Sequence, residues 1–196
     1  FAQFTDCIAE GFKVMVPATL ILTLAWTISG VTNDLLGATD FVAVAMESVA
    51  KGLENFLPAI IFIVACLLAF ATGTSWGTFG ILIPIVVNAF GTDAGTILTI
   101  GLAACLAGAV CGDHCSPISD TTILASTGAQ CYHLNHVKTQ LPYALTVAAV
   151  SFVNYILAGI IQNVVVNLII AFASMFAVLM LMRFVFDRKP AGAEVK

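Results

Sequence analysis

Apolar residues run through this chain in long stretches that contain few charged positions. The stretches cover about residues 14–29, 56–90, 94–130, 141–161 and 164–186. About 20 apolar residues suffice for a helix to cross a bilayer, so stretches of this length indicate membrane spans. The pattern predicts an all-α polytopic membrane helix bundle of about five spans. It forms one membrane domain, residues 1–190, followed by a short polar tail at 191–196.

Two of these stretches, 56–90 and 94–130, are each about 35 residues long, more than one crossing needs. Small and polar residues interrupt both: Ala71–Gly80 reads ATGTSWGTFG, and Gly112–Thr122 reads GDHCSPISDTT. Each stretch therefore predicts two short helices that flank an unwound segment in mid-membrane. Unwound backbone is tolerated there only where it is buried in protein or lines a wet cavity. Paired interruptions of this kind indicate a transporter binding site.

Composition supports an integral membrane protein. Of the 196 residues, 60% are hydrophobic and only 9% are charged, too few to cover a water-exposed surface. The net charge of −4 is small and dispersed, which gives no indication of a nucleic-acid partner. Position 1 is Phe, and no signal peptide is visible, so we expect a fragment or one half of a larger protein.

The interruption at 112–122 carries the ionisable residues. Pro117 has no N–H group and disfavours helical geometry at Ser116. One helix should therefore end near 112–113, and the next should begin near 119–120, where Ser and Asp are good N-cap types. The residues expected to break the two helices are Gly73, Gly77, Gly112 and Pro117.

An oxygen-rich cluster is expected at this break. Carbonyl groups freed at the end of the first helix carry partial negative charge, and Asp113 adds a full charge, at a cost of roughly 2.5–3.5 kcal/mol at bilayer depth. The neighbouring hydroxyl groups belong to Ser116, Ser119, Thr121 and Thr122. This set of hard oxygen ligands suits a hard cation, so Asp113 is the candidate Na+ ligand.

Two residues beside Asp113 have more than one interpretation. Asp120 either caps the second half-helix or binds the ion directly. His114 either carries a proton or braces the broken backbone through a hydrogen bond, and the brace is favoured. Asp113 has no such routine role, which favours ion or proton binding there.

The interruption at 71–80 contains no carboxylate. Small residues that let helices pack closely are the simpler interpretation, but the density of glycine and hydroxyl residues exceeds what packing requires. Thr74 and Ser75 are therefore expected to face the ion site, and Trp76 is expected to wall or gate the cavity.

Residues 40–53 have helical spacing of apolar positions, which predicts either a short amphipathic helix at the membrane interface or a solvated connector. With five spans, the two termini would lie on opposite sides of the membrane. The excess of Lys and Arg predicts a cytoplasmic C-terminus in the plasma membrane. The basic residues then inside are Lys51, Lys138, Arg183, Arg188 and Lys189, and Lys13 alone lies outside.

Cys and His residues raise the alternative of an intramembrane metal-binding protein or enzyme. The residues concerned are Cys111, His114, Cys115, Cys131, His133 and His136. Their spacing fits no standard zinc pattern, and we expect neither zinc nor any other cofactor. His133 and His136 are interpreted as ordinary surface histidines.

The segment 112–123 resembles the signature segment of the NhaC-type Na+/H+ antiporters. The segment 71–81 resembles that family's other glycine–hydroxyl segment, and Leu24–Gly30 is similar to its preceding span. The resemblance extends over about 19–143. It implies a secondary transporter, not an enzyme, built from two inverted repeats of which this chain is the C-terminal one. It also implies that Asp113 is the ion-binding or proton-binding carboxylate, with Ser116, Ser119, Asp120, Thr121, Thr74 and Ser75 as neighbours.

The leading hypothesis is Na+/H+ antiport in pH homeostasis, by competition of Na+ and H+ for the Asp113 carboxylate. The alternative is Na+- or H+-coupled exchange of small organic acids such as malate or lactate. The absence of Arg and Lys from both breaks weakens an anion site in this half. The expected partners are Na+, H+, the lipid bilayer and the missing N-terminal half, and homo-oligomers are also compatible with the sequence.

Overall fold

The computed structural model describes residues 2–31, 35–37, 40–41, 44, 54–90 and 95–186. Within these residues the chain is helical and forms no strand, which confirms the predicted all-α class. The helices are α1 (Ala2–Gly30), α3 (Leu57–Thr72), α4 (Ser75–Phe90), α5 (Thr96–Cys115), α6 (Asp120–Gly128), α7 (His133–Ile161) and α8 (Val164–Phe186), with a 3-10 turn, η2 (Glu54–Phe56). The predictions for 40–53, Lys51, Arg188, Lys189 and the 191–196 tail lie wholly or mostly outside the described residues.

Both long apolar stretches are broken into two helices, as predicted. The stretch 56–90 forms α3 and α4, separated at residues 73–74, and the stretch 94–130 contains α5 and α6, separated at residues 116–119. In the part of the chain that is described, α5, α7 and α8 are long and apolar enough to cross a membrane, and α3 and α4 are shorter. The result is a membrane helix bundle with two discontinuous elements.

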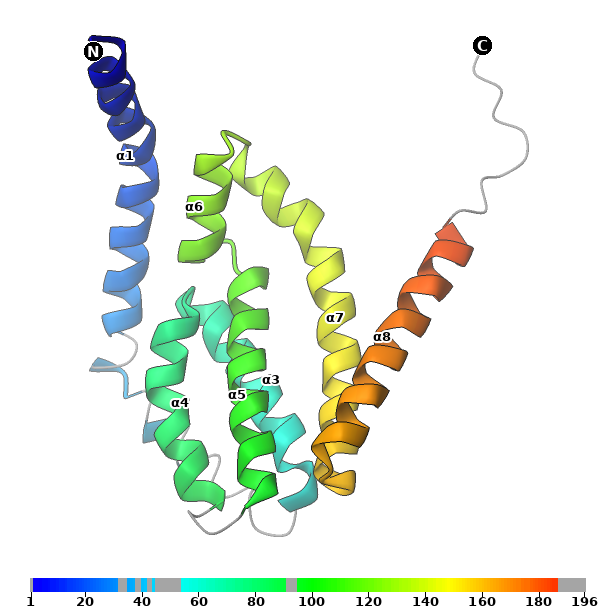
Figure 1. The fold of residues 1–196 in the computed structure, drawn as a ribbon. Coiled ribbons are helices and arrows are strands. Elements are labelled where there is room, and N and C mark those ends of the chain that lie inside the picture. Colours follow the sequence, from blue (N-terminus) through cyan, green and yellow to red (C-terminus); the bar gives the residue numbers. More distant parts are fainter. Residues whose placement is uncertain are drawn as a thin grey trace.

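The two breaks differ in direction. In Figure 1, α6 continues away from α5, whereas α4 folds back beside α3, so that α3 and α4 form a hairpin whose two ends lie at one end of the bundle. Gly73 turns the chain there, because its φ of 69° is left-handed and favours glycine. The stretch 56–90 therefore enters the bundle and returns.

This hairpin changes the predicted placement of the termini. The first turn of α1 and the last turn of α8 lie at the same end of the bundle in Figure 1, whereas termini on opposite sides of the membrane were predicted. Lys138 is in the second turn of α7 and Arg183 is in the last turn of α8, and these two helix ends also lie at that end of the bundle in Figure 1. Lys13, which was predicted to lie alone outside, is in the first half of α1.

Helices α3 and α5 form the centre of the bundle. Gly108 and Gly112 are four residues apart on α5, and a Cβ atom at either position would collide with a backbone carbonyl of α3, that of Phe62 or of Cys66. Such a small-xxx-small pair lets two membrane helices approach closely. Gly112 was predicted to break the helix, but it lies inside α5 and serves this packing. Gly77 likewise lies inside α4.

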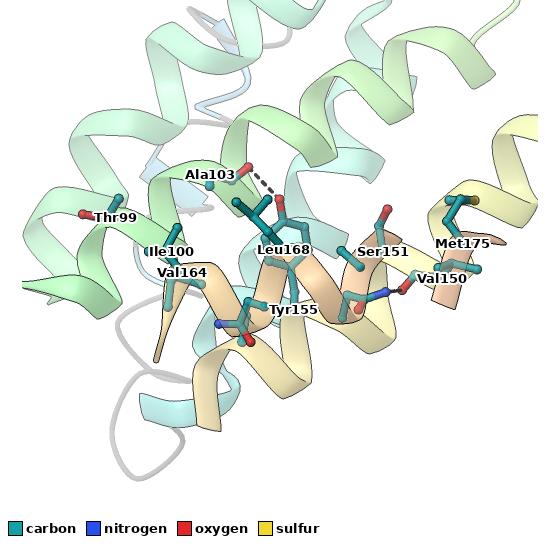
Figure 2. Close-up of a pocket in the computed structure, with 13 residues that line it drawn as sticks. Thr99, Ile100, Ala103, Val150, Ser151, Tyr155, Val164, Leu168 and Met175 are labelled. Atoms are coloured by element: carbon teal, nitrogen blue, oxygen red, sulfur yellow. Dashed lines mark hydrogen bonds between the residues drawn. The ribbon is translucent and has the colours of Figure 1, made fainter. Parts of the chain in front are cut away.

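Helix α7 covers the other side of this centre and holds α8. Tyr155 of α7 donates a hydrogen bond from its Oη to the carbonyl oxygen of Ala103 on α5, at 3.1 Å (Figure 2). Asn154 donates from Nδ2 to Ser174 Oγ of α8, at 2.9 Å. These side-chain contacts fix α7 between α5 and α8, beside a mostly apolar cavity of about 300 Å³.

Candidate functional site

The two helix breaks touch each other through their backbones. The N–H of Asp120 donates to the carbonyl oxygen of Gly73, at 3.1 Å. A Cβ atom at Gly73 would lie 2.6 Å from the carbonyl oxygen of Ile118, so only glycine permits this approach. The turn between α3 and α4 therefore rests directly on the segment that joins α5 to α6.

Asp113 lies beside this contact, in the last turn of α5. It is 1% exposed, and its Oδ2 accepts a hydrogen bond of 2.8 Å from Thr121 Oγ1 on α6. Its other oxygen, Oδ1, is buried and has no hydrogen-bond partner among the described residues. A buried charge is costly unless it is paired, and a buried oxygen without a partner costs further free energy. This carboxylate is therefore suited to receive a proton or a cation.

The hydroxyl groups of Ser119 and Thr121, at the start of α6, form a chain of hydrogen bonds that ends on Asp113. Thr121 has one hydroxyl hydrogen and gives it to the carboxylate, so the 2.8 Å contact between Ser119 Oγ and Thr121 Oγ1 must use the hydrogen of Ser119. Ser119 Oγ in turn accepts from the N–H of Thr122, at 3.1 Å. A directed chain therefore links the start of α6 to Asp113.

Ser119 is the N-cap of α6, and Asp120 is the first helical residue. The interpretation of Asp120 as the cap is thus corrected, because the serine hydroxyl takes the Thr122 amide. The Asp120 carboxylate interacts with the side chain of Thr74 and, electrostatically, with Asp113. The remaining predicted oxygen ligands Ser116, Thr122 and Ser75 are all buried near the breaks.

The two carboxylates lie at helix ends that carry opposite partial charges. Asp113 is at the C-terminal end of α5, where the helix carries partial negative charge that disfavours an anion and favours a cation. Asp120 is at the N-terminal end of α6, where the partial positive charge of the helix favours an anion. Asp113 is therefore the carboxylate with more to gain from an exchangeable positive charge.

Two histidines exchange the roles that the sequence gave them. His114 is exposed, and its Nδ1 bonds the carbonyl oxygen of Val110 in its own helix, at 2.8 Å, so its ring does not brace the break. His133 Nε2 instead donates to the carbonyl oxygen of Pro117, at 2.7 Å, and its Nδ1 contacts Ser126 Oγ, at 3.0 Å. Interpreting His133 as an ordinary surface residue was wrong. The only sequence signal for this role of His133 was that the break at Pro117 frees a backbone carbonyl group, which needs a hydrogen-bond donor.

Trp76 lies on the surface of α4. Its side chain is 78% exposed and makes an edge-to-face contact with Phe79 at a centroid distance of 5.8 Å. In the described chain it is not enclosed as a cavity wall would be. Nor do three His, Cys, Asp or Glu side chains come together in a metal-binding group in that part of the chain.

The comparisons with known proteins agree with one another on the family. The model of the Na+/H+ antiporter family matches residues 1–160. An uncharacterized protein of Haemophilus influenzae is 48% identical over 149 residues, which are 76% of this chain and 28% of that protein. The malate-2H(+)/Na(+)-lactate antiporter of Bacillus subtilis is 34% identical over 163 residues, 81% of this chain and 33% of that protein. An uncharacterized Na(+)/H(+) antiporter of Haemophilus influenzae is 32% identical over 165 residues, 82% of this chain and 33% of that protein.

The chain thus spans about a third or less of the length of these relatives. No solved structure matches it. The family match covers both helix breaks and every residue of the site described above. The chain belongs to the Na+/H+ antiporter family.

Proposed function

We propose that this chain supplies the cation-binding carboxylate of a Na+/H+ antiporter, and that Na+ and H+ compete for Asp113. The observation that carries the proposal is the buried Oδ1 of Asp113, which has no hydrogen-bond partner in the described chain while Oδ2 is held by Thr121. Either a proton or Na+ would neutralise this charge. Because one carboxylate cannot hold both, each turnover would exchange one species for the other.

The surrounding oxygen atoms support Na+ over a softer metal. Hard cations prefer carboxylate, carbonyl and hydroxyl oxygens. The breaks offer the Asp113 and Asp120 carboxylates and the hydroxyls of Ser116 and Thr74. Neither break contains Lys or Arg, so an organic anion would need cationic groups from the remainder of the full-length protein. This favours ion antiport over organic-acid exchange for the part of the protein described.

Competition is tested by measuring Na+ affinity against pH in proteoliposomes of the full-length protein. If protons and Na+ share one carboxylate, the apparent Kd for Na+ should rise by up to about tenfold for each unit by which pH falls, by mass action. The maximal rate at saturating Na+ should stay constant over the same range. An apparent Na+ affinity that does not change between pH 6 and pH 9 would show that protons do not compete with Na+ for its site in that range.

We also propose that the end of the bundle carrying both termini faces the cytoplasm. The start of α7, which carries Lys138, and the last turn of α8, which carries Arg183, lie at that end, and Lys13 is in the first half of α1, which starts there. An excess of basic residues is typical of the cytoplasmic side. Because α4 folds back beside α3, the start of α1 lies at the same end of the bundle as the start of α7 and the end of α8. The membrane in question is taken to be the plasma membrane.

Two native cysteines test this topology. Cys7 and Cys131 are both exposed, near the start of α1 and between α6 and α7, and these segments lie at the same end in Figure 1. In single-cysteine variants of the full-length protein, a membrane-impermeant maleimide should label both from the cytoplasmic side. Asn163→Cys, between α7 and α8 at the other end, should label from outside. Labelling of Cys7 and Cys131 from opposite sides would restore the five-span topology.

A further inference from the structure

A second cavity lies between α5 and α7, on the side of α5 away from its contact with α4. It has a volume of about 740 Å³. Its apolar wall includes Leu106, Val110 and Val147, and its polar groups include His114, Gln140 and Tyr143. No Lys, Arg, Asp or Glu is among the described residues that line it. The ion-site proposal makes no use of these polar side chains.

The hydrogen bond of His114 fixes which nitrogen faces a ligand. The carbonyl oxygen of Val110 can only accept, so the Nδ1 of His114, 2.8 Å away, must carry the hydrogen. In a neutral imidazole the second nitrogen, Nε2, is then an acceptor. The neutral ring of His114, which is among the residues that line the cavity, therefore has its free lone pair on Nε2.

Gln140 is fixed by the same reasoning. Its Nε2 donates to the backbone carbonyl oxygen of His114, at 3.2 Å, and a carbonyl cannot donate in return. The amide orientation is thereby determined, and Gln140 Oε1 remains as an acceptor. Two acceptors from two helices, His114 Nε2 and Gln140 Oε1, therefore belong to one cavity.

We propose that this cavity binds a small primary organic ammonium ion. The three N–H donors of an ammonium group complement His114 Nε2 and Gln140 Oε1, and the alkyl part would pack on Leu106 and Val147. The C-terminal end of α5, where His114 lies, carries partial negative charge that also favours a cation. A carboxylate ligand would instead place its oxygen atoms against these two acceptors, and its hydrogen bonds would have to come from the hydroxyl groups of Tyr143 and Ser151. This site is separate from the ion site and does not depend on the antiport mechanism.

Calorimetry on the purified full-length protein tests the proposal with three ligands of equal chain length. At pH 8.5 in phosphate buffer, which contains no amine, n-butylammonium should bind at least about tenfold more tightly than n-butanol or butyrate. Equal binding of n-butanol would show that only the apolar wall matters. Preference for butyrate would overturn the proposal outright.

Variants assign the binding to the two acceptors. Gln140→Leu and His114→Phe should each weaken n-butylammonium binding by about tenfold or more, whereas His136→Phe, outside the lining residues, should leave it unchanged. His114→Arg, which brings donors in place of an acceptor, should reverse the preference toward butyrate. If His114→Phe fails to fold, Gln140→Leu decides alone, and full affinity in Gln140→Leu would overturn the proposal. The assay needs no ion gradient, so a failure of Na+/H+ exchange leaves its outcome readable.

Discussion

Replacing Asp113 by Asn in the full-length protein is expected to abolish Na+-driven proton movement. The amide is close in shape to the carboxylate and can still accept the hydrogen bond that Thr121 donates to Oδ2. It cannot take up a proton at working pH, and it lacks the charge that would balance Na+. The measurement is the pH change inside proteoliposomes after a Na+ gradient is imposed, and we expect a rate below about 1% of wild type, equivalent to roughly 2.7 kcal/mol or more of lost stabilisation.

Three control variants separate charge from folding and from position. Asp113→Glu keeps a titratable group but adds a methylene at a site that is 1% exposed, so a reduced but measurable rate is expected. Asp120→Asn should keep exchange and weaken Na+ affinity, since the second carboxylate contributes charge without being the exchanged group. Asp6→Asn, exposed on α1, should behave as wild type. Wild-type exchange in a well-folded Asp113→Asn protein would contradict the proposal that Na+ and H+ compete for the Asp113 carboxylate.

The different expectations for Asp113 and Asp120 come from their positions on two helix ends that meet. One carboxylate is at the negative end of α5, and the other is at the positive end of α6. Moving the break by one turn in either direction would reverse or remove that difference. The position of Pro117 is therefore part of the chemistry, because it sets where both helices end.

The sequence predicted this break well because the local rules agree there. Pro117 cannot continue a helix, and Ser119 is a strong N-cap type, so the position of the break follows from two neighbouring residues. The structure places the end of α5 at Cys115, slightly later than predicted, since the Asp113 carbonyl still accepts from Ser116 N–H. These local rules therefore predicted the position of the break to within one turn of the helix.

The hairpin of α3 and α4 could not be predicted in the same way. A stretch of about 35 apolar residues with a glycine near its centre is compatible with a helix that continues or with one that returns. The direction depends on whether Gly73 adopts a left-handed φ, which in turn depends on its contact with Asp120 and Ile118, far away in sequence. His133 was missed for the same reason, because its partner Pro117 is 16 residues away.

Gly73→Ala is expected to be the most damaging change outside the carboxylate itself. Alanine at a φ of 69° costs about 1–2 kcal/mol, and its Cβ would lie 2.6 Å from the Ile118 carbonyl oxygen. The turn must then move away from the α5–α6 segment, which disrupts the hydrogen bond from Asp120 N–H to the Gly73 carbonyl. We expect a lower melting temperature and at least a tenfold loss of Na+/H+ exchange, measured by thermal unfolding and in proteoliposomes.

Two further variants distinguish the backbone conformation at Gly73 from its close contact. Gly80→Ala, inside α4 with nothing within 4 Å of a Cβ atom, should keep exchange and gain about 0.5–1 kcal/mol of stability, because alanine suits a helix better than glycine. Gly73→Asn tolerates the left-handed conformation but still carries a Cβ atom. If the contact between the breaks is what exchange requires, Asn should fail as Ala does. Full rescue by Asn would show that backbone strain alone explains the loss, and that the ion site does not need the two breaks to touch.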